Sequence, residues 1–232
     1  RLERGRVSHE KLKKAFYAAW ALGRIPTVLF VGITGSLAMM NSQRGSDIDL
    51  FIITKKKTLW ITRFTALLLA KLLSIPTRSA GKFFYDNSLC FNLWINEDHL
   101  EITGGQRNVY TAHEVLQIVP LVNKNKTFEK FLAKNNWARD FWPKAFARFM
   151  INDLSIMNDD LRFKTKNRKS YILNLNSMFF SAIELIAYRF QLWRMRNHRT
   201  RETIEPGRAF FHPIDWGEYV IGEFEKRLQE YR

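Results

Sequence analysis

Two aspartates are the residues whose type and spacing point most directly to chemistry in this chain. Asp47 and Asp49 are separated by one residue and open an apolar run, Leu50 to Ile53. Side chains alternate along a strand, so both carboxylates are expected on the same face. Paired carboxylates repel each other unless a cation lies between them, and Mg²⁺ binds a few carboxylates together with phosphate oxygens. The pair therefore predicts a site for Mg²⁺ or Mn²⁺.

A Gly-Ser dipeptide upstream supplies a second candidate function. Gly35 and Ser36 follow an apolar run, Thr27 to Ile33, at a point where a strand is expected to turn into a helix. The backbone N–H groups and the hydroxyl at such a turn form a seat for phosphate. A phosphate seat and a metal pair in one short unit predict nucleotidyl transfer from a nucleoside triphosphate (NTP).

These residues resemble the signature of the nucleotidyltransferase superfamily in its minimal form. The pattern is an apolar residue, Gly, then Gly or Ser, a spacer, and Asp-apolar-Asp/Glu-apolar. It is filled here, with Thr34 in the first apolar place, by Gly35, Ser36, Asp47, Asp49 and Leu50. The resemblance covers about residues 25 to 103. It implies a polymerase-β-like fold, an NTP with Mg²⁺ or Mn²⁺, and transfer of a nucleoside monophosphate to a hydroxyl with release of pyrophosphate.

The resemblance also implies a third acid, on a later strand, that helps to bind a second metal ion or acts as a base. On the expected strand, Leu89 to Ile95, the matching place is held by Asn92, which is neutral but has an amide oxygen. The alternative is Glu101 within Leu100 to Ile102, a segment expected to pair back as a hairpin strand. Topology favours Asn92, whereas a different strand assignment makes Glu101 catalytic alongside the two aspartates. Asn92 then stays a nucleotide-binding candidate with the Gly-Ser pair.

The charge of the chain bears on its partners. Its 232 residues carry a net charge of +15, which attracts polyanions such as RNA and disfavours a cationic small molecule as acceptor. Segment 189–208 holds six arginines. Arginine binds phosphate bidentately and stacks on bases. The candidate nucleic-acid contacts in this segment are Arg194, Arg196 and Arg199.

Two functions remain open on these residues. The first is a Mg²⁺-dependent nucleotidyltransferase whose acceptor is RNA, a protein hydroxyl or a small molecule, and the resemblance also implies a helical partner protein. The second is a catalytically degenerate nucleic-acid-binding protein on the same fold, which Asn92 favours. Attachment of the basic helices to a membrane surface is a weaker third reading. One cysteine, Cys90, and no apolar stretch long enough to span a bilayer predict a cytoplasmic protein.

Hydrophobic periodicity predicts an α+β fold in two parts. Residues 1–108 are expected to form the small mixed-sheet nucleotidyltransferase domain that the resemblance implies, and residues 109–232 an α-helical domain. The first part is expected to contain a helix from a capping Ser8 to Leu22, the helix Leu59–Leu73, the strands Thr27–Ile33, Ile48–Thr54 and Leu89–Ile95, and the hairpin strand. The second part is expected to contain the helices Thr111–Val119, Thr127–Phe141, Ala145–Met157, Ser170–Arg196 and Asp215–Tyr231.

Overall fold

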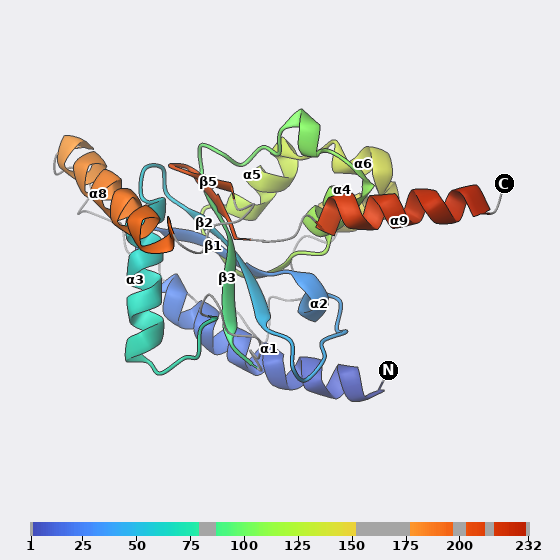
Figure 1. The fold of residues 1–232 in the computed structure, drawn as a ribbon, viewed down its shortest axis with the longest axis horizontal. Helices are drawn as coiled ribbons and strands as arrows, with labels where there is room; N and C mark the ends of the chain where they lie inside the picture. Colours follow the sequence, from blue (N-terminus) through green and yellow to red (C-terminus); the bar gives the residue numbers. More distant parts are fainter. Residues whose placement is uncertain (1, 79–86, 152–176, 197–202, 212–215, 231–232) are drawn as a thin grey trace.

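The computed structural model describes residues 2–78, 87–151, 177–196, 203–211 and 216–230. These form three layers, a mixed sheet with helices on each of its two faces (Figure 1). The sheet has the order β4-β1-β2-β3-β6-β5. Strands β2 and β3 are parallel, and the other neighbouring pairs are antiparallel. The strands are β1 (Val28–Ile33), β2 (Ile48–Thr54), β3 (Leu89–Asn96), β4 (Val119–Asn123), β5 (Thr203–Glu205) and β6 (Arg208–Phe210). The predicted α+β class with a small mixed sheet is confirmed.

One face of the sheet is covered by α1 (Leu2–Gly23) and α3 (Leu59–Leu72). Strand β2 shows why the two faces differ, since its side chains alternate. Ile48, Leu50 and Ile52 pack into the core beneath these two helices, whereas Phe51 and Ile53 belong to the core on the opposite face. Asp49 shares its parity with Phe51 and Ile53, so the alternation assigns its side chain to the opposite face.

That opposite face is covered by short helices from the middle of the chain. Aromatic side chains fill the interface: Phe30 stacks on Phe128 with ring centroids 5.1 Å apart, and Phe51 contacts Phe131 at 5.2 Å. Such pairs add to the free energy gained from burying their area. The helices are α4 (Val109–Leu116), α5 (Thr127–Lys134), α6 (Ala138–Phe141) and α7 (Pro143–Ile151).

The predicted hairpin strand Leu100–Ile102 is wrong, because Asn135 takes up the backbone groups of that segment. The buried Asn135 side chain donates to Leu100 O at 2.7 Å and accepts from Ile102 N at 2.9 Å. The segment therefore runs as a loop between β3 and α4. The same residue ends α5, so the predicted helix Thr127–Phe141 is two helices.

Three strands come from the part of the chain predicted to be purely helical. β4 contains Pro120 and lies at the edge of the sheet, where a residue without an N–H group is tolerated. The predicted helix Thr111–Val119 therefore stops early, at Leu116. β5 and β6 form a hairpin across Pro206-Gly207, and β6 pairs with β3. The division of the chain at residue 108 stays a prediction, and strands from both sides of it share the sheet.

Ser8 lies inside α1 rather than capping it, and its hydroxyl donates to Arg4 O. Two further helices are α8 (Ser177–Met195) and α9 (Trp216–Glu230). α8 is fixed to α3 by the buried Glu184, whose carboxylate accepts from Trp60 N at 2.7 Å and Ile61 N at 2.9 Å. The predicted helical positions 152–157, 170–176, 215 and 231 lie outside the described residues. In the described part of the chain, no helix has the length and apolarity needed to cross a membrane.

Candidate active site

The loop that leads to Asp47 is held by a lysine buried in α1. Lys11 is 1% exposed, and its Nζ donates to Gln43 O at 2.6 Å and to Arg44 O at 3.1 Å. It also donates to the backbone oxygen and the hydroxyl of Ser46. An ammonium placed among carbonyl oxygens satisfies several acceptors at once. The residue before Asp47 is thereby attached to the first helix of the chain.

Gly35 lies where β1 ends and packs directly against Asp49. Its φ is +62°, a left-handed conformation that favours glycine. A Cβ at this position would lie 2.7 Å from Asp49 Oδ2, so a side chain would collide with the carboxylate. Thr34 N donates to Asp49 O at 3.1 Å, which fixes the turn to β2. The neighbouring Ser36 is exposed, with its hydroxyl 3.3 Å from that of Ser42. The structure thus brings the predicted Gly-Ser turn and the second aspartate together.

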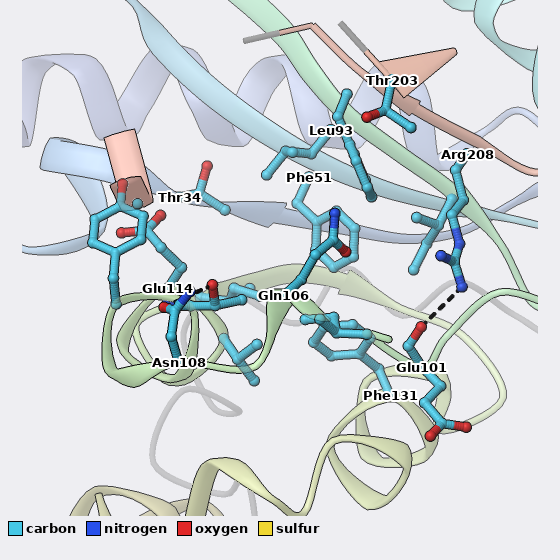
Figure 2. Close-up of a pocket in the computed structure, with 18 of the residues that line it drawn as sticks. Thr34, Phe51, Leu93, Glu101, Gln106, Asn108, Glu114, Phe131, Thr203 and Arg208 are labelled. Atoms are coloured by element: carbon cyan, nitrogen blue, oxygen red, sulfur yellow. Dashed lines mark hydrogen bonds between the residues drawn. The ribbon is translucent and has the colours of Figure 1, made fainter. Parts of the chain in front are cut away.

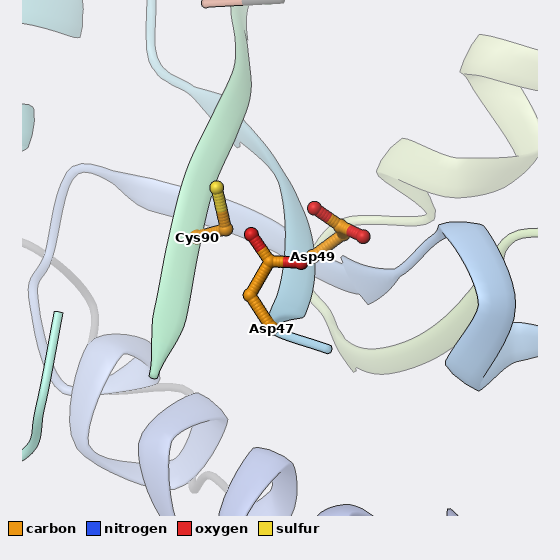
Figure 3. Close-up of side chains that lie close together, drawn as sticks. All are labelled: Asp47, Asp49 and Cys90. Atoms are coloured by element: carbon orange, nitrogen blue, oxygen red, sulfur yellow. The ribbon is translucent and has the colours of Figure 1, made fainter. Parts of the chain in front are cut away.

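Asp47 and Asp49 converge with Cys90 of β3 (Figure 3). One ligand atom from each of the three lies within 4.8 Å of the other two. The pKa of Asp49 is raised from 3.8 to about 7, chiefly by burial and next by the charges of Asp47 and Glu114, while Arg78 and the hydrogen bond from Asn92 act to lower it. The metal-free pair is therefore electrostatically unfavourable. A divalent cation would relieve this repulsion.

Arg78 supplies positive charge beside the pair. Its Nη1 donates to Asp47 Oδ2 at 3.0 Å and lies 3.6 Å from Cys90 Sγ. The arginine backbone is fixed to the start of β3, because Arg78 N donates to Leu89 O at 2.9 Å and Leu89 N donates to Pro76 O at 2.8 Å. The guanidinium therefore reaches Asp47 from the β3 side of the site.

Asn92 faces Asp49 because β3 carries an irregularity at this point. Asp49 pairs with Cys90 but Phe51 pairs with Leu93, so β3 has one residue more than β2 between these pairs. Such a bulge re-aims a side chain. Asn92 Nδ2 donates to Asp49 Oδ1 at 2.6 Å, and Asn92 Oδ1 accepts from the Cys90 thiol. The end of the amide that faces the acid is the nitrogen, not the oxygen expected to contact a cation.

Cys90 behaves as a neutral donor in this arrangement. Burial raises the pKa of the Cys90 thiol well above its usual range, and the charges of Asp49 and Asp47 raise it further. Metal ligation by cysteine requires the thiolate. The two carboxylates are therefore the ligands that this cluster offers to a hard cation such as Mg²⁺, which prefers oxygen. Their chemistry fits the predicted metal.

Glu101, the alternative third acid, lies elsewhere. It is one of the residues that line a pocket beside the site, but its carboxylate pairs with Arg107 Nη2 at 2.6 Å and points away from the centre of that pocket (Figure 2). Its backbone oxygen accepts from Arg208 Nη2 at 3.0 Å. Among the described residues, no hydrogen bond or ion pair joins Glu101 to either aspartate. The structure thus brings Asn92, and not Glu101, to the predicted acidic pair.

The arginine candidates are only partly placed. Arg194 and Arg196 are exposed at the C-terminal end of α8, which packs on α3 on the face of the sheet opposite the acidic pair. Arg199 lies outside the described residues. The structure does not bring Arg194 and Arg196 to the site, so any nucleic acid bound there would meet a surface separate from the aspartates.

A pocket of about 680 Å³ adjoins the site on the Asp49 face of the sheet (Figure 2). Two of its lining residues connect it to the site. The backbone N–H of Thr34 donates to Asp49 O, and the charge of Glu114 raises the pKa of Asp49. The apolar wall is formed by Phe51, Leu93, Ile95, Phe131 and Phe210, and polar groups are added by Gln106, Asn108, Thr111 and Arg208. Its volume is in the range of sites for small molecules.

Lys11, Arg78 and Glu114 were missed by reasoning from the sequence. Lys11 and Arg78 each contact residues more than thirty positions away in the sequence. Glu114 acts through its charge, which raises the pKa of Asp49. None belongs to a motif with fixed spacing. The only signal that could have drawn attention to Lys11 is its place on the apolar face of a helix, next to Leu12 and Ala15.

Comparisons with known proteins give remote likenesses. No protein-family model matches the chain, and no curated protein matches it. A solved toxin–antitoxin structure with AMP-PNP is similar at 17% identity and a TM-score of 0.34, over 60% of this chain and 98% of that one. A mutant of the toxin–antitoxin pair MntA–HpeT is similar at 16% identity and a TM-score of 0.30, over 56% and 88%. TM-scores this low do not establish a common fold.

Proposed function

We propose that the protein is a Mg²⁺-dependent nucleotidyltransferase that moves a nucleoside monophosphate from an NTP to a hydroxyl. The observation that carries this proposal is the convergence of Asp47 and Asp49 against Gly35 at the edge of a ligand-sized pocket. The two carboxylates repel each other and lie next to a glycine turn. A divalent cation bound to a triphosphate would neutralise that repulsion. The Gly-Ser signature and its spacing agree with this geometry.

Each residue of the site has a role in the proposal. Asp47 and Asp49 hold the divalent ion, Gly35 lets the Asp49 carboxylate lie directly against the turn, and the Ser36 hydroxyl donates to a phosphate oxygen. A bound Mg²⁺ would neutralise charge on the triphosphate and lower the pKa of the acceptor hydroxyl. That hydroxyl oxygen bonds to the α-phosphorus while the bond from the α-phosphorus to the leaving oxygen breaks. Pyrophosphate departs, and the hydroxyl proton passes to water.

The pocket receives the part of a substrate that is not phosphate. Its apolar wall suits the face of an aromatic ring such as a nucleobase, and its amide and guanidinium groups can form hydrogen bonds with the polar edge of that ring. Replacing Gln106, which extends into the pocket in Figure 2, with tryptophan should fill the pocket without disturbing the core, because Gln106 is exposed at the end of the 3-10 turn Gly104–Gln106. We expect KM for NTP or acceptor to rise about tenfold or more, with the Mg²⁺ affinity unchanged. Titration calorimetry with Mg²⁺ alone, beside steady-state kinetics, measures both.

The control for the Gln106 variant is Lys134→Trp, which adds a tryptophan at an exposed position on α5. Gln117 does not serve, because its side chain donates a hydrogen bond to Glu114, which lines the pocket. Equal effects of the two tryptophans on KM would remove the pocket from the proposal.

The experiment that tests the function itself is a screen of all four NTPs with Mg²⁺ or Mn²⁺ and total tRNA, which follows transfer of label from the α-phosphate. Absence of transfer with every combination would contradict the nucleotidyltransferase proposal and favour the second candidate function.

That second candidate is nucleic-acid binding without chemistry, and the neutral Asn92 at the third-acid position favours it. If the arginines of segment 189–208 bind phosphate, log K should fall steeply with log salt, and replacing Arg194, Arg196 and Arg199 with alanine should reduce the slope by about 2 for single strands. Fluorescence anisotropy with labelled RNA at several salt concentrations measures this. The control removes three exposed cations from α5–α7: Lys130, Arg139 and Lys144. Equal slopes for the two triple variants would place the RNA elsewhere.

A further inference from the structure

The carboxylate oxygens of the acidic pair are already partly used by N–H donors. Asp47 Oδ2 accepts from Arg78 Nη1 at 3.0 Å, and Asp49 Oδ1 accepts from Asn92 Nδ2 at 2.6 Å. Asp49 Oδ2 is the atom that approaches Gly35. Two of the four oxygens are therefore occupied from the β3 side. The proposed triphosphate seat lies on the other side, at the turn after β1.

We infer that Arg78 takes the place of a second metal ion, so that the site binds a single divalent cation between Asp47 and Asp49 while the guanidinium stays on Asp47. This inference rests on the proposed function, since it concerns the metal content of that same site. It explains how a neutral asparagine can stand where the resemblance implies a third acid.

Charge is the first reason. A divalent cation between two carboxylates balances them, and Arg78 leaves the site with one positive charge. A second divalent ion would leave three, of which the Glu114 charge that acts on Asp49 offsets at most one, and in the nucleotide-free site like charges this close repel strongly. The guanidinium is always protonated and cannot relieve the repulsion by losing a proton. The site therefore accommodates either Arg78 or a second ion.

Anchoring is the second reason. The backbone that carries the partly exposed Arg78 side chain is held against β3: Arg78 N donates to Leu89 O, Pro76 O accepts from Leu89 N, and Thr77 forms a bridge with Leu89. Leu89 immediately precedes Cys90, which pairs with Asp49 in the sheet. The arginine is therefore positioned by the same strand pair that positions the aspartate.

The proposal predicts the number of ions that the protein binds. Mn²⁺ alone is titrated into the protein, and free Mn²⁺ is followed by electron paramagnetic resonance. The wild type should bind one ion per chain. Asn92→Asp should still bind one, more tightly. Arg78→Ala should bind the first ion about tenfold more tightly, because a competing cation is gone. The double variant Arg78→Ala/Asn92→Asp, which lacks the arginine and has a third acid, should bind two.

The matched control is Arg107→Ala, which removes an arginine from a similar ion pair, with Glu101, outside the site. It should bind one ion with unchanged affinity. Two ions on the wild type would overturn the inference while leaving the proposed function intact, and one ion on the double variant would overturn it as well. No ion on the wild type would contradict the proposed function itself. The wild-type stoichiometry decides the point even if a variant fails to fold, which thermal melting reports.

Discussion

Replacing Asp49 with asparagine is expected to stabilise the metal-free protein at pH 8, to abolish Mg²⁺ binding, and to reduce nucleotidyl transfer by about a thousandfold or more. Asparagine has the shape of the carboxylate and keeps an oxygen that can accept from Asn92 Nδ2. It removes the charge that burial and Asp47 make unfavourable. Melting curves with EDTA and with Mg²⁺, beside a transfer assay, measure all three effects.

The sign of the stability effect follows from the pKa of Asp49. The folded, metal-free protein holds the Asp49 proton with a pKa of about 7, against 3.8 for the ordinary group. The folded state therefore binds the proton more tightly than the unfolded chain, so stability falls as pH rises from about 4 to about 7 and stays low above that. Asp49 keeps partial contact with solvent, which limits the cost at pH 8 to about 2–4 kcal/mol.

The variant should therefore melt roughly 5–10 °C above the wild type at pH 8 in EDTA. The difference should shrink to less than half at pH 5 and vanish near pH 4. Mg²⁺ should raise the melting temperature of the wild type and leave that of the variant unchanged. Asp140→Asn, which changes an exposed aspartate on α6, is the control and should show neither effect. A variant less stable than the wild type at pH 8 would show that the Asp49 charge is stabilised by the fold.

Replacing Asn92 with aspartate is expected to tighten Mg²⁺ binding about tenfold and to destabilise the metal-free protein. The change adds an anion beside Asp49 and removes the amide N–H that donates to Asp49 Oδ1. A third carboxylate strengthens the attraction for a cation and, without the cation, adds repulsion. The gain in melting temperature on adding Mg²⁺ should therefore be larger than in the wild type. Calorimetric titration and melting curves measure the two effects.

Glu101→Gln provides the contrast, because the Glu101 carboxylate is bonded to Arg107 and not to the site. It should leave Mg²⁺ affinity nearly unchanged, and any effect on transfer should appear in KM, because Glu101 lines the pocket. Loss of transfer in Glu101→Gln, with no gain of affinity in Asn92→Asp, would show that the loop after β3 brings the third acid to the site in the complex. The structure of the free protein would then differ from that of the active one.

The sequence predicts well those elements whose pattern is local. The apolar runs of β1, β2 and β3 and the spacing of Asp47 and Asp49 mark the central sheet and its acidic edge, because alternation and turn residues are written in adjacent positions. β4 was missed because Val119-Pro120 reads as a helix end. β5 and β6 were missed because strands of three residues carry too little periodicity to be distinguished from a loop.

The remainder of the site depends on contacts that no spacing records. Lys11 acts on a loop more than thirty residues away, and Arg78 reaches Asp47 only because a bridge to Leu89 brings it there. The orientation of Asn92 depends on a bulge in β3, and a shift of one residue reverses the face to which a strand side chain points. Asn135 ends one helix and fixes a distant loop, so the choice between Asn92 and Glu101 required the tertiary structure.

The most direct test of nucleotidyl transfer at Asp47 and Asp49 is to follow two labels separately. NTP labelled at the α-phosphorus, or at the γ-phosphorus, is incubated with the protein, Mg²⁺ or Mn²⁺, and total RNA or cell extract. The α-label should appear in the acceptor and the γ-label in pyrophosphate, in equal amounts. Both should disappear with EDTA and in Asp47→Asn and Asp49→Asn. Movement of the γ-label to the acceptor, or transfer that persists in both variants, would contradict the assignment.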